Sequence, residues 1–143
     1  QDISVLNKLG LSVVIVHGGG PRIERELKKS NIQSRFINGL RVTDKDVINI
    51  VEKVLIDFNN DIVDSLNKKG SKAVSINTKT NNIINVIPDQ PELGFVGVPQ
   101  EINVKIIKNI KIKYLLLLPW VWTKINKLII LMGIQQLVLL QRN

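Results

Sequence analysis

Apolar residues along this chain follow two alternating patterns. In one they form unbroken runs rich in Val and Ile, at Leu11–Val16, Ala73–Ile76 and Ile83–Ile87. Such runs are typical of strands buried on both faces of a parallel sheet. In the other they recur at helical spacing, and the predicted helices cover Asp2–Leu9, Pro21–Lys29, a segment after Thr43 that runs to about Val54, Asp61–Lys69 and Glu101–Ile110. Shorter extended segments are predicted at Gln33–Ile37 and Leu93–Gly97. Alternating strands and helices predict an α/β fold with a largely parallel sheet.

Three consecutive glycines, Gly18–Gly20, join the first strand to a helix that begins at Pro21. Glycine lets the backbone turn sharply and approach a ligand closely, and a helix N-terminus adds free N–H donors and a positive dipole end. The junction therefore predicts a site for a phosphate or a carboxylate. It lacks the Lys-Ser/Thr of a Walker loop and the spacing of a dinucleotide fingerprint. A tight turn without a ligand is an equal alternative on these residues alone.

Arg41 lies between two local signals, an Asn38-Gly39 turn and a predicted helix start. Thr43, with Asp46 three residues later, matches a capping box. A guanidinium held in this position would clamp a carboxylate through two parallel hydrogen bonds. A solvated surface arginine is the alternative, and the residues alone favour it.

Composition narrows the possible functions. The 143 residues suffice for one domain or part of one, and the absence of Cys excludes a disulfide framework or a thiolate metal site. His17 is the only histidine, which excludes a metal centre built from several histidines. The net charge is +8, but residues 1–110 hold 15 basic and 12 acidic side chains, interspersed, with few aromatics. That distribution argues against nucleic acid as the partner.

Three segments together resemble the acetylglutamate kinases of the amino acid kinase family. They are Val14-Ile15-Val16-His17-Gly18-Gly19-Gly20-Pro21, Phe36-Ile37-Asn38-Gly39-Leu40-Arg41-Val42-Thr43-Asp44 and Leu93-Gly94-Phe95-Val96-Gly97. The glycine block is shared with related kinases that act on carbamate, aspartate or nucleotides. The segment around Arg41 is more particular to the acetylglutamate enzymes. The resemblance covers residues 1–110.

This resemblance implies a three-layer αβα sandwich, with residues 1–110 as its N-terminal, substrate-binding half. It also implies phosphoryl transfer from MgATP to the side-chain carboxylate of N-acetyl-L-glutamate, in arginine biosynthesis. Gly19 and Gly20 are the implied catalytic and substrate-binding residues, through their backbone N–H groups. Arg41 is the implied ligand of the substrate α-carboxylate, and Gly18 belongs to the cofactor side. No chemical role is assigned to His17.

The same resemblance implies a homo-oligomer, regulation by the PII signal protein in photosynthetic members, and a location in the bacterial cytoplasm or the plastid stroma. The chain also departs from the family pattern. The family's first strand, with its lysine, and its nucleotide-binding half have no counterpart here, and the segments 57–60 and 78–81 differ from the usual family residues. We therefore expect these 143 residues to be inactive as a kinase. The alternative from another class is a non-catalytic module for amino-acid binding or dimerisation.

Residues 111–143 have a different character, with 20 apolar residues of 33, both Trp and no acidic residue. A hydrophobic helical tail or a membrane-surface anchor is one interpretation, although Leu128–Leu140 is too short to span a bilayer comfortably. An out-of-frame translation explains more. Trp and Met have one codon each, so some residues of another reading frame follow from the protein sequence alone. When the gene is read from the third base of each codon, the codons that begin in Trp120, Trp122 and Met132 must encode Gly, Asp and Gly. These residues match the family's Gly-x-Asp and its later Ala/Gly in order and spacing, so residues from about Lys111 onward are predicted to be a frameshift product.

Overall fold

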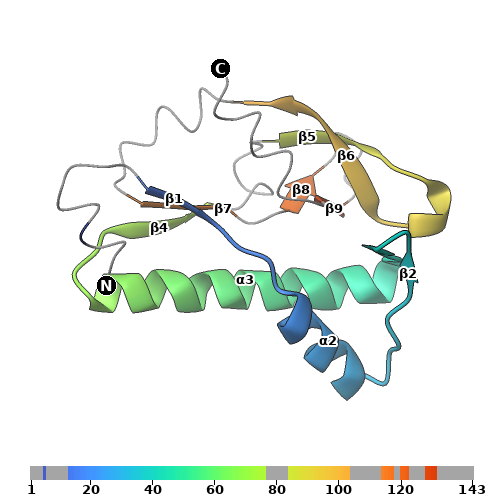
Figure 1. Ribbon diagram of the computed structural model, residues 1–143, viewed down its shortest axis with the longest axis horizontal. Helices are drawn as coiled ribbons and strands as arrows, with labels where there is room; N and C mark the ends of the chain where they lie inside the picture. Colours follow the sequence, from blue (N-terminus) through green and yellow to red (C-terminus); the bar gives the residue numbers. More distant parts are fainter. Residues whose placement is uncertain are drawn as a thin grey trace.

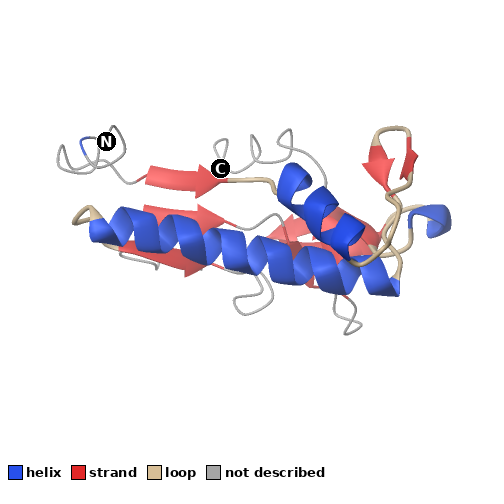
Figure 2. Ribbon diagram, turned by 90° about the horizontal axis from the view of Figure 1, so that it is seen from below, coloured by secondary structure: helices blue, strands red, loops and turns tan. Residues whose placement is uncertain are grey.

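The structure is a computed structural model that describes Val5 and residues 13–76, 84–103, 114–117, 120–122 and 128–131. The predicted helix Asp2–Leu9, apart from Val5, and residues 104–110 of the predicted helix Glu101–Ile110 lie outside these residues. Within the described residues, two helices lie on one side of the strands, as Figure 1 and Figure 2 show from perpendicular directions. The mixture of strands and helices confirms the predicted α/β class.

One sheet has three parallel strands. β1 (Val13–Val16) and β4 (Ala73–Ile76) flank β7 (Tyr114–Leu117), so the sheet order is β1-β7-β4. Val13 and Ala73 both pair with Tyr114, and the three strands stay in register from there to their last residues. The two Val/Ile runs therefore form parallel strands, as predicted, with a third strand between them.

A second sheet is mixed rather than parallel. Its order is β5-β6-β9-β8, formed by β5 (Ile84–Pro88), β6 (Val96–Ile102), β9 (Leu128–Leu131) and β8 (Trp120–Trp122). β6 runs antiparallel to β5 and parallel to β9, and β8 runs antiparallel to β9. The prediction of a helix from Glu101 is wrong at its start, because Glu101 and Ile102 continue β6 and pair with β5.

The predicted extended segment Leu93–Gly97 is only half correct. Residues Pro91–Leu93 form the short 3-10 turn η1, and the strand begins at Val96. Pro91 favours the turn, since its fixed φ suits the first turn of a helix. Gly94 ends it with a φ of 72°, a conformation that glycine adopts without cost.

Two helices pack against each other to form the main core. α2 (Gly20–Lys29) buries Ile23 and Leu27 against α3 (Lys45–Lys68), which contributes a stripe of apolar residues at helical spacing. The buried members of that stripe are Val47, Ile48, Val51, Val54 and Leu55. α3 is one continuous helix of 24 residues, so the prediction of two separate helices is wrong. In Figure 1 it runs along both sheets.

The start of α3 also differs from the predicted capping box. Asp44, not Thr43, is the N-cap residue, and its carboxylate accepts hydrogen bonds from the backbone N–H groups of Asp46 and Val47 at 3.1 and 2.9 Å. The Thr43 side chain instead donates to the Arg41 carbonyl at 3.0 Å. The predicted Asn-Gly turn is confirmed, with φ of 51° at Asn38 and 80° at Gly39. Two positive φ values are what a tight hairpin turn requires.

The described part of the tail lies in strands, within β7, β8 and β9. The interpretation of the tail as helical is therefore wrong for these residues. The division into residues 1–110 and an out-of-frame segment 111–143 stays a prediction. Of the helices that the structure describes, neither is long and apolar enough to cross a membrane.

Candidate functional site

The glycine block lies where the parallel strand β1 meets a helix. β1 ends at Val16, residues 17–19 form the turn, and α2 begins at Gly20 with Pro21 in its first turn. Gly19 is the N-cap residue, and its carbonyl accepts the first helical hydrogen bond, from Ile23 N–H, at 2.9 Å. No side chain caps this helix end. Its first N–H groups and the positive end of its dipole are therefore available to an anion.

The three glycines have different surroundings. Gly19 is buried, and a Cβ added there would lie 2.5 Å from Leu55 Cδ2 of α3. Gly18 and Gly20 are exposed, and a Cβ added to either would meet no atom of the described residues within 4 Å. Neither has the left-handed backbone that requires glycine. Packing therefore explains Gly19, whereas nothing in the described part of the chain requires glycine at the other two positions.

His17 is held from two sides at the start of the turn. Its Nε2 lies 3.2 Å from Asn59 Oδ1 of α3, its Nδ1 lies 3.1 Å from the Gly18 carbonyl, and its ring packs edge-on against Phe58 at 4.8 Å. Asn59 is fully buried, and its amide donates to the Ser75 hydroxyl of β4. This chain of hydrogen bonds ties the glycine turn to both α3 and the sheet.

Arg41 is in the hairpin that follows α2, formed by β2 (Phe36–Ile37) and β3 (Leu40–Arg41). Its guanidinium lies 4.7 Å from the centre of the Phe36 ring, the residue directly opposite in the hairpin. Its Nη1 lies 3.2 Å from Glu24 Oε2 of α2, and it also donates to the Ser34 hydroxyl. The side chain is only 11% exposed, so the expectation of a solvent-exposed cation is wrong.

Glu24 links these groups. Ser34 donates a hydrogen bond to the Glu24 carboxylate at 2.5 Å. This bond and the nearby Arg41 and Lys28 charges hold the pKa of Glu24 below its ordinary value, against the opposing effect of desolvation. Glu24 therefore carries its negative charge at neutral pH. Glu24 is four residues beyond Gly20, about 6 Å along the axis of α2, so it lies near the middle of this helix.

The third sequence motif supports the strand that carries Arg41. Thr43 N–H donates to the Leu93 carbonyl at 2.9 Å, and Phe95 N–H donates to the Thr43 carbonyl at 2.7 Å. A Cβ at Gly94 would collide with that same Thr43 carbonyl. Leu93-Gly94-Phe95 therefore fixes the segment between Arg41 and the cap of α3.

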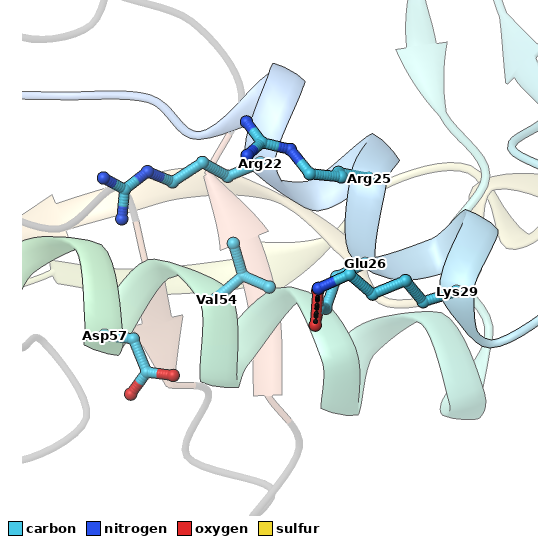
Figure 3. Close-up of a pocket in the computed structure, with 6 residues that line it drawn as sticks. All are labelled: Arg22, Arg25, Glu26, Lys29, Val54 and Asp57. Atoms are coloured by element: carbon cyan, nitrogen blue, oxygen red, sulfur yellow. Dashed lines mark hydrogen bonds and ion pairs between the residues drawn. The ribbon is translucent and has the colours of Figure 1, made fainter.

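A separate pocket of about 300 Å³ lies between α2 and α3 (Figure 3). It is lined by Arg22, Arg25, Glu26, Lys29, Val54 and Asp57. Lys29 pairs with Glu26 at 2.9 Å, and Arg22 pairs with Asp61 at 2.6 Å, so its charges are largely compensated. None of the predicted site residues lines this pocket.

The described residues fit a phosphate better than a metal. Free N–H groups at the start of α2 suit phosphate oxygens. Across the described ranges, no group of three or more His, Asp or Glu side chains is arranged to hold a metal ion. The described residues therefore supply no ligand set for Mg²⁺.

Sequence comparison identifies the family. The sequence profile described as "Amino acid kinase family" matches residues 1–116. The chain belongs to the amino acid kinase family. Proteins named acetylglutamate kinase are similar over the same part: one from Pelagibacter ubique is 56% identical over 110 residues, and one from Ruegeria pomeroyi is 43% identical over 111 residues. Each alignment covers 77% of this chain, which spans about two fifths of the length of these relatives (38% and 39%).

Solved structures confirm the amino acid kinase fold. A Streptococcus mutans protein, smu.665, superimposes with a TM-score of 0.83 and 25% identity, covering 90% of this chain and 54% of its own. An N-acetylglutamate synthase from Neisseria gonorrhoeae, complexed with coenzyme A and N-acetyl-glutamate, gives a TM-score of 0.76 at 18% identity. That match covers 94% of this chain and 32% of the synthase, and it supports the fold alone.

Proposed function

We propose that this chain is the substrate-binding half of an acetylglutamate kinase. In that reaction the γ-phosphoryl group of ATP moves to the side-chain carboxylate of N-acetyl-L-glutamate, and ADP leaves. Phosphoryl transfer depends mainly on positioning and on charge stabilisation. The identity of 56% over 110 residues to a protein named acetylglutamate kinase supports this choice of reaction.

The proposal that the glycine turn binds a ligand rests on the open surroundings of Gly18 and Gly20. Gly20 is the first residue of α2 and has an ordinary helical backbone, where alanine stabilises a protein by about 0.4–1 kcal/mol because it restricts the unfolded chain, so glycine has no advantage for folding there. The space above it is open among the described residues, and the N–H groups there have no side-chain cap. We assign Gly19 and Gly20 N–H groups to the substrate and the transferring phosphoryl, and Gly18 to the cofactor side. Close approach of a ligand then explains why no side chain is present at positions 18 and 20.

Arg41 is the proposed ligand of the substrate α-carboxylate. Its guanidinium is mostly buried and held by three neighbours, which is the preorganisation that a bidentate clamp needs.

MgATP is the proposed phosphoryl donor, and the phosphate end of ATP would meet the N–H groups of the glycine turn. The further proposals rest on the family alone: a homo-oligomer, contact with the PII signal protein, and action in the bacterial cytoplasm or the plastid stroma. The bacterial origin of the similar kinases favours the bacterial location.

Isothermal titration of N-acetyl-L-glutamate into the protein tests the substrate site. We expect binding that Arg41→Ala weakens at least tenfold, because loss of one partner of a charge-assisted pair costs about 2–5 kcal/mol. Arg35→Ala is the matched control, since Arg35 is exposed and lies just before the same hairpin. Failure of N-acetyl-L-glutamate to bind, or equal binding by Arg41→Ala and the wild-type protein, would contradict the proposal.

A further inference from the structure

We propose that Glu24 is a positioning residue for Arg41: it holds one edge of the guanidinium so that the other edge faces the substrate carboxylate. This inference rests on the proposed function, because it takes Arg41 as the carboxylate ligand. Glu24 itself does not touch the substrate in this proposal.

The hydrogen bonds of Arg41 to the described residues are confined to one of its nitrogen atoms. Nη1 receives both polar neighbours, the Glu24 carboxylate and the Ser34 hydroxyl. Within the described part of the chain, Nη2 and Nε of Arg41 form no hydrogen bond. A guanidinium presents its donors in a planar fork, so a planar carboxylate needs two neighbouring donors on one edge. Nη2 and Nε form such an edge, and it is the edge that the protein leaves unused.

Three side chains from different segments fix the plane of the guanidinium. Phe36 of β2 contacts one face of it, Glu24 of α2 accepts from its end, and Ser34 bridges the two polar groups from the loop between them. A free arginine side chain loses rotamer entropy when a ligand binds, and a side chain that is already held loses less. Glu24 and Ser34 therefore raise the affinity of Arg41 for a carboxylate without contacting that carboxylate.

The charge of Glu24 sets the direction of approach. Glu24 is ionised, and a second carboxylate at Nη1 would meet a like charge at short range. A ligand that approaches from the Nη2 and Nε edge has the guanidinium between its own charge and that of Glu24. The pair thus selects one of the two possible edges of Arg41.

Titrations with two ligands test the proposal. One is N-acetyl-L-glutamate, and the other is 4-acetamidobutanoate, which lacks only the α-carboxylate. We expect Glu24→Ala and Ser34→Ala each to weaken N-acetyl-L-glutamate binding about tenfold and to leave 4-acetamidobutanoate binding unchanged. Ser34→Thr keeps the hydroxyl and should restore most of the affinity. Glu26→Ala is the control, because Glu26 is an acid of the same helix that pairs with Lys29 instead.

The outcomes separate this inference from the function on which it rests. If Arg41→Ala weakens N-acetyl-L-glutamate but Glu24→Ala does not, only the role of Glu24 is wrong. A gain in affinity on removing Glu24 would show that it competes with the substrate, and equal losses for both ligands would show a purely structural role. If Arg41→Ala has no effect, the proposed function itself fails.

Discussion

Gly19 and Gly20 are neighbours in the sequence, yet their surroundings are opposite. Gly19 faces inward onto Leu55, and Gly20 faces open space at the start of α2. The same substitution at each position therefore separates a packing role from a ligand role.

Gly19→Ala should lower the free energy of unfolding by about 1–3 kcal/mol, the usual cost of overpacking. Gly20→Ala should leave that free energy unchanged or raise it by up to about 1 kcal/mol, because alanine favours a helix. It should also weaken anion binding at the turn. Urea unfolding followed by circular dichroism measures the first two effects, and titration with N-acetyl-L-glutamate and ATP measures the third. If Gly20→Ala destabilises the protein as much as Gly19→Ala, glycine at position 20 is structural.

For single residues, the sequence predicted where the glycine turn lies but not which side chains contact Arg41. The order strand, glycines, Pro21 was sufficient to place the turn, because it depends only on local backbone preferences. No local pattern indicated that Arg41 would be buried beside Glu24, since that pairing exists only after the hairpin has docked on α2. The buried contact of Asn59 could have been suspected from the sequence, because Asn59 is a polar residue at a core position of α3. Its hydrogen bonds to His17 and Ser75 explain why a polar side chain is tolerated there.

The polar residues around Asn59 also explain why α3 was predicted as two helices. Asp57, Asn59 and Asn60 interrupt the apolar pattern, and a loop is the usual interpretation of such a break. In the structure the helix continues through them, because Asn59 finds buried partners and its exposed neighbours face outward. A helix interior tolerates a buried amide when both of its polar atoms are satisfied.

The cap of α3 gives a test at the scale of the element. Asp44→Ala removes an N-cap side chain that accepts two backbone N–H groups, so the free energy of unfolding should fall by about 1 kcal/mol, within a range of roughly 0.5–2. Asp46→Ala is the matched control. It removes an acid from the first turn without removing the cap, and should cost only a few tenths of a kcal/mol. Chemical denaturation of both variants decides between Asp44 as the cap and the capping box of Thr43 and Asp46.

For the whole molecule, the sequence predicted the parallel β1 and β4 but not the strand between them. The contrast in composition between residues 1–110 and 111–143 suggested a separate tail, whereas the structure has Tyr114–Leu117 in the middle of a sheet. A strand between two parallel neighbours is typically an apolar run, and Tyr114–Leu117 is such a run, so composition alone did not exclude these residues from the sheet.

The coding DNA tests the frameshift prediction. Read from the third base of each codon after about Lys111, it should encode the family segment Gly-x-Asp followed by Asn-x-Asn-(Ala/Gly)-Asp-Thr, with no stop codon as far as residue 143. The codons of Trp120, Trp122 and Met132 fix only three of these residues. A stop codon, or a different residue at the two asparagine positions, would contradict the prediction and leave the tail as the native sequence of the gene.

The strand order β1-β7-β4 has a consequence for how the protein is made. Val13 pairs with Tyr114, a partner 101 positions later in the chain, and Ala73 pairs with that same residue. During synthesis the first two strands therefore emerge from the ribosome well before the strand that joins them, and each presents open backbone groups in the meantime. Pairing over such separations is slow, because the entropy cost of closing a long loop must be met before any stabilising contact forms. Until β7 is synthesised, the edges of β1 and β4 that will face it have no partner strand, and exposed strand edges of this kind favour aggregation.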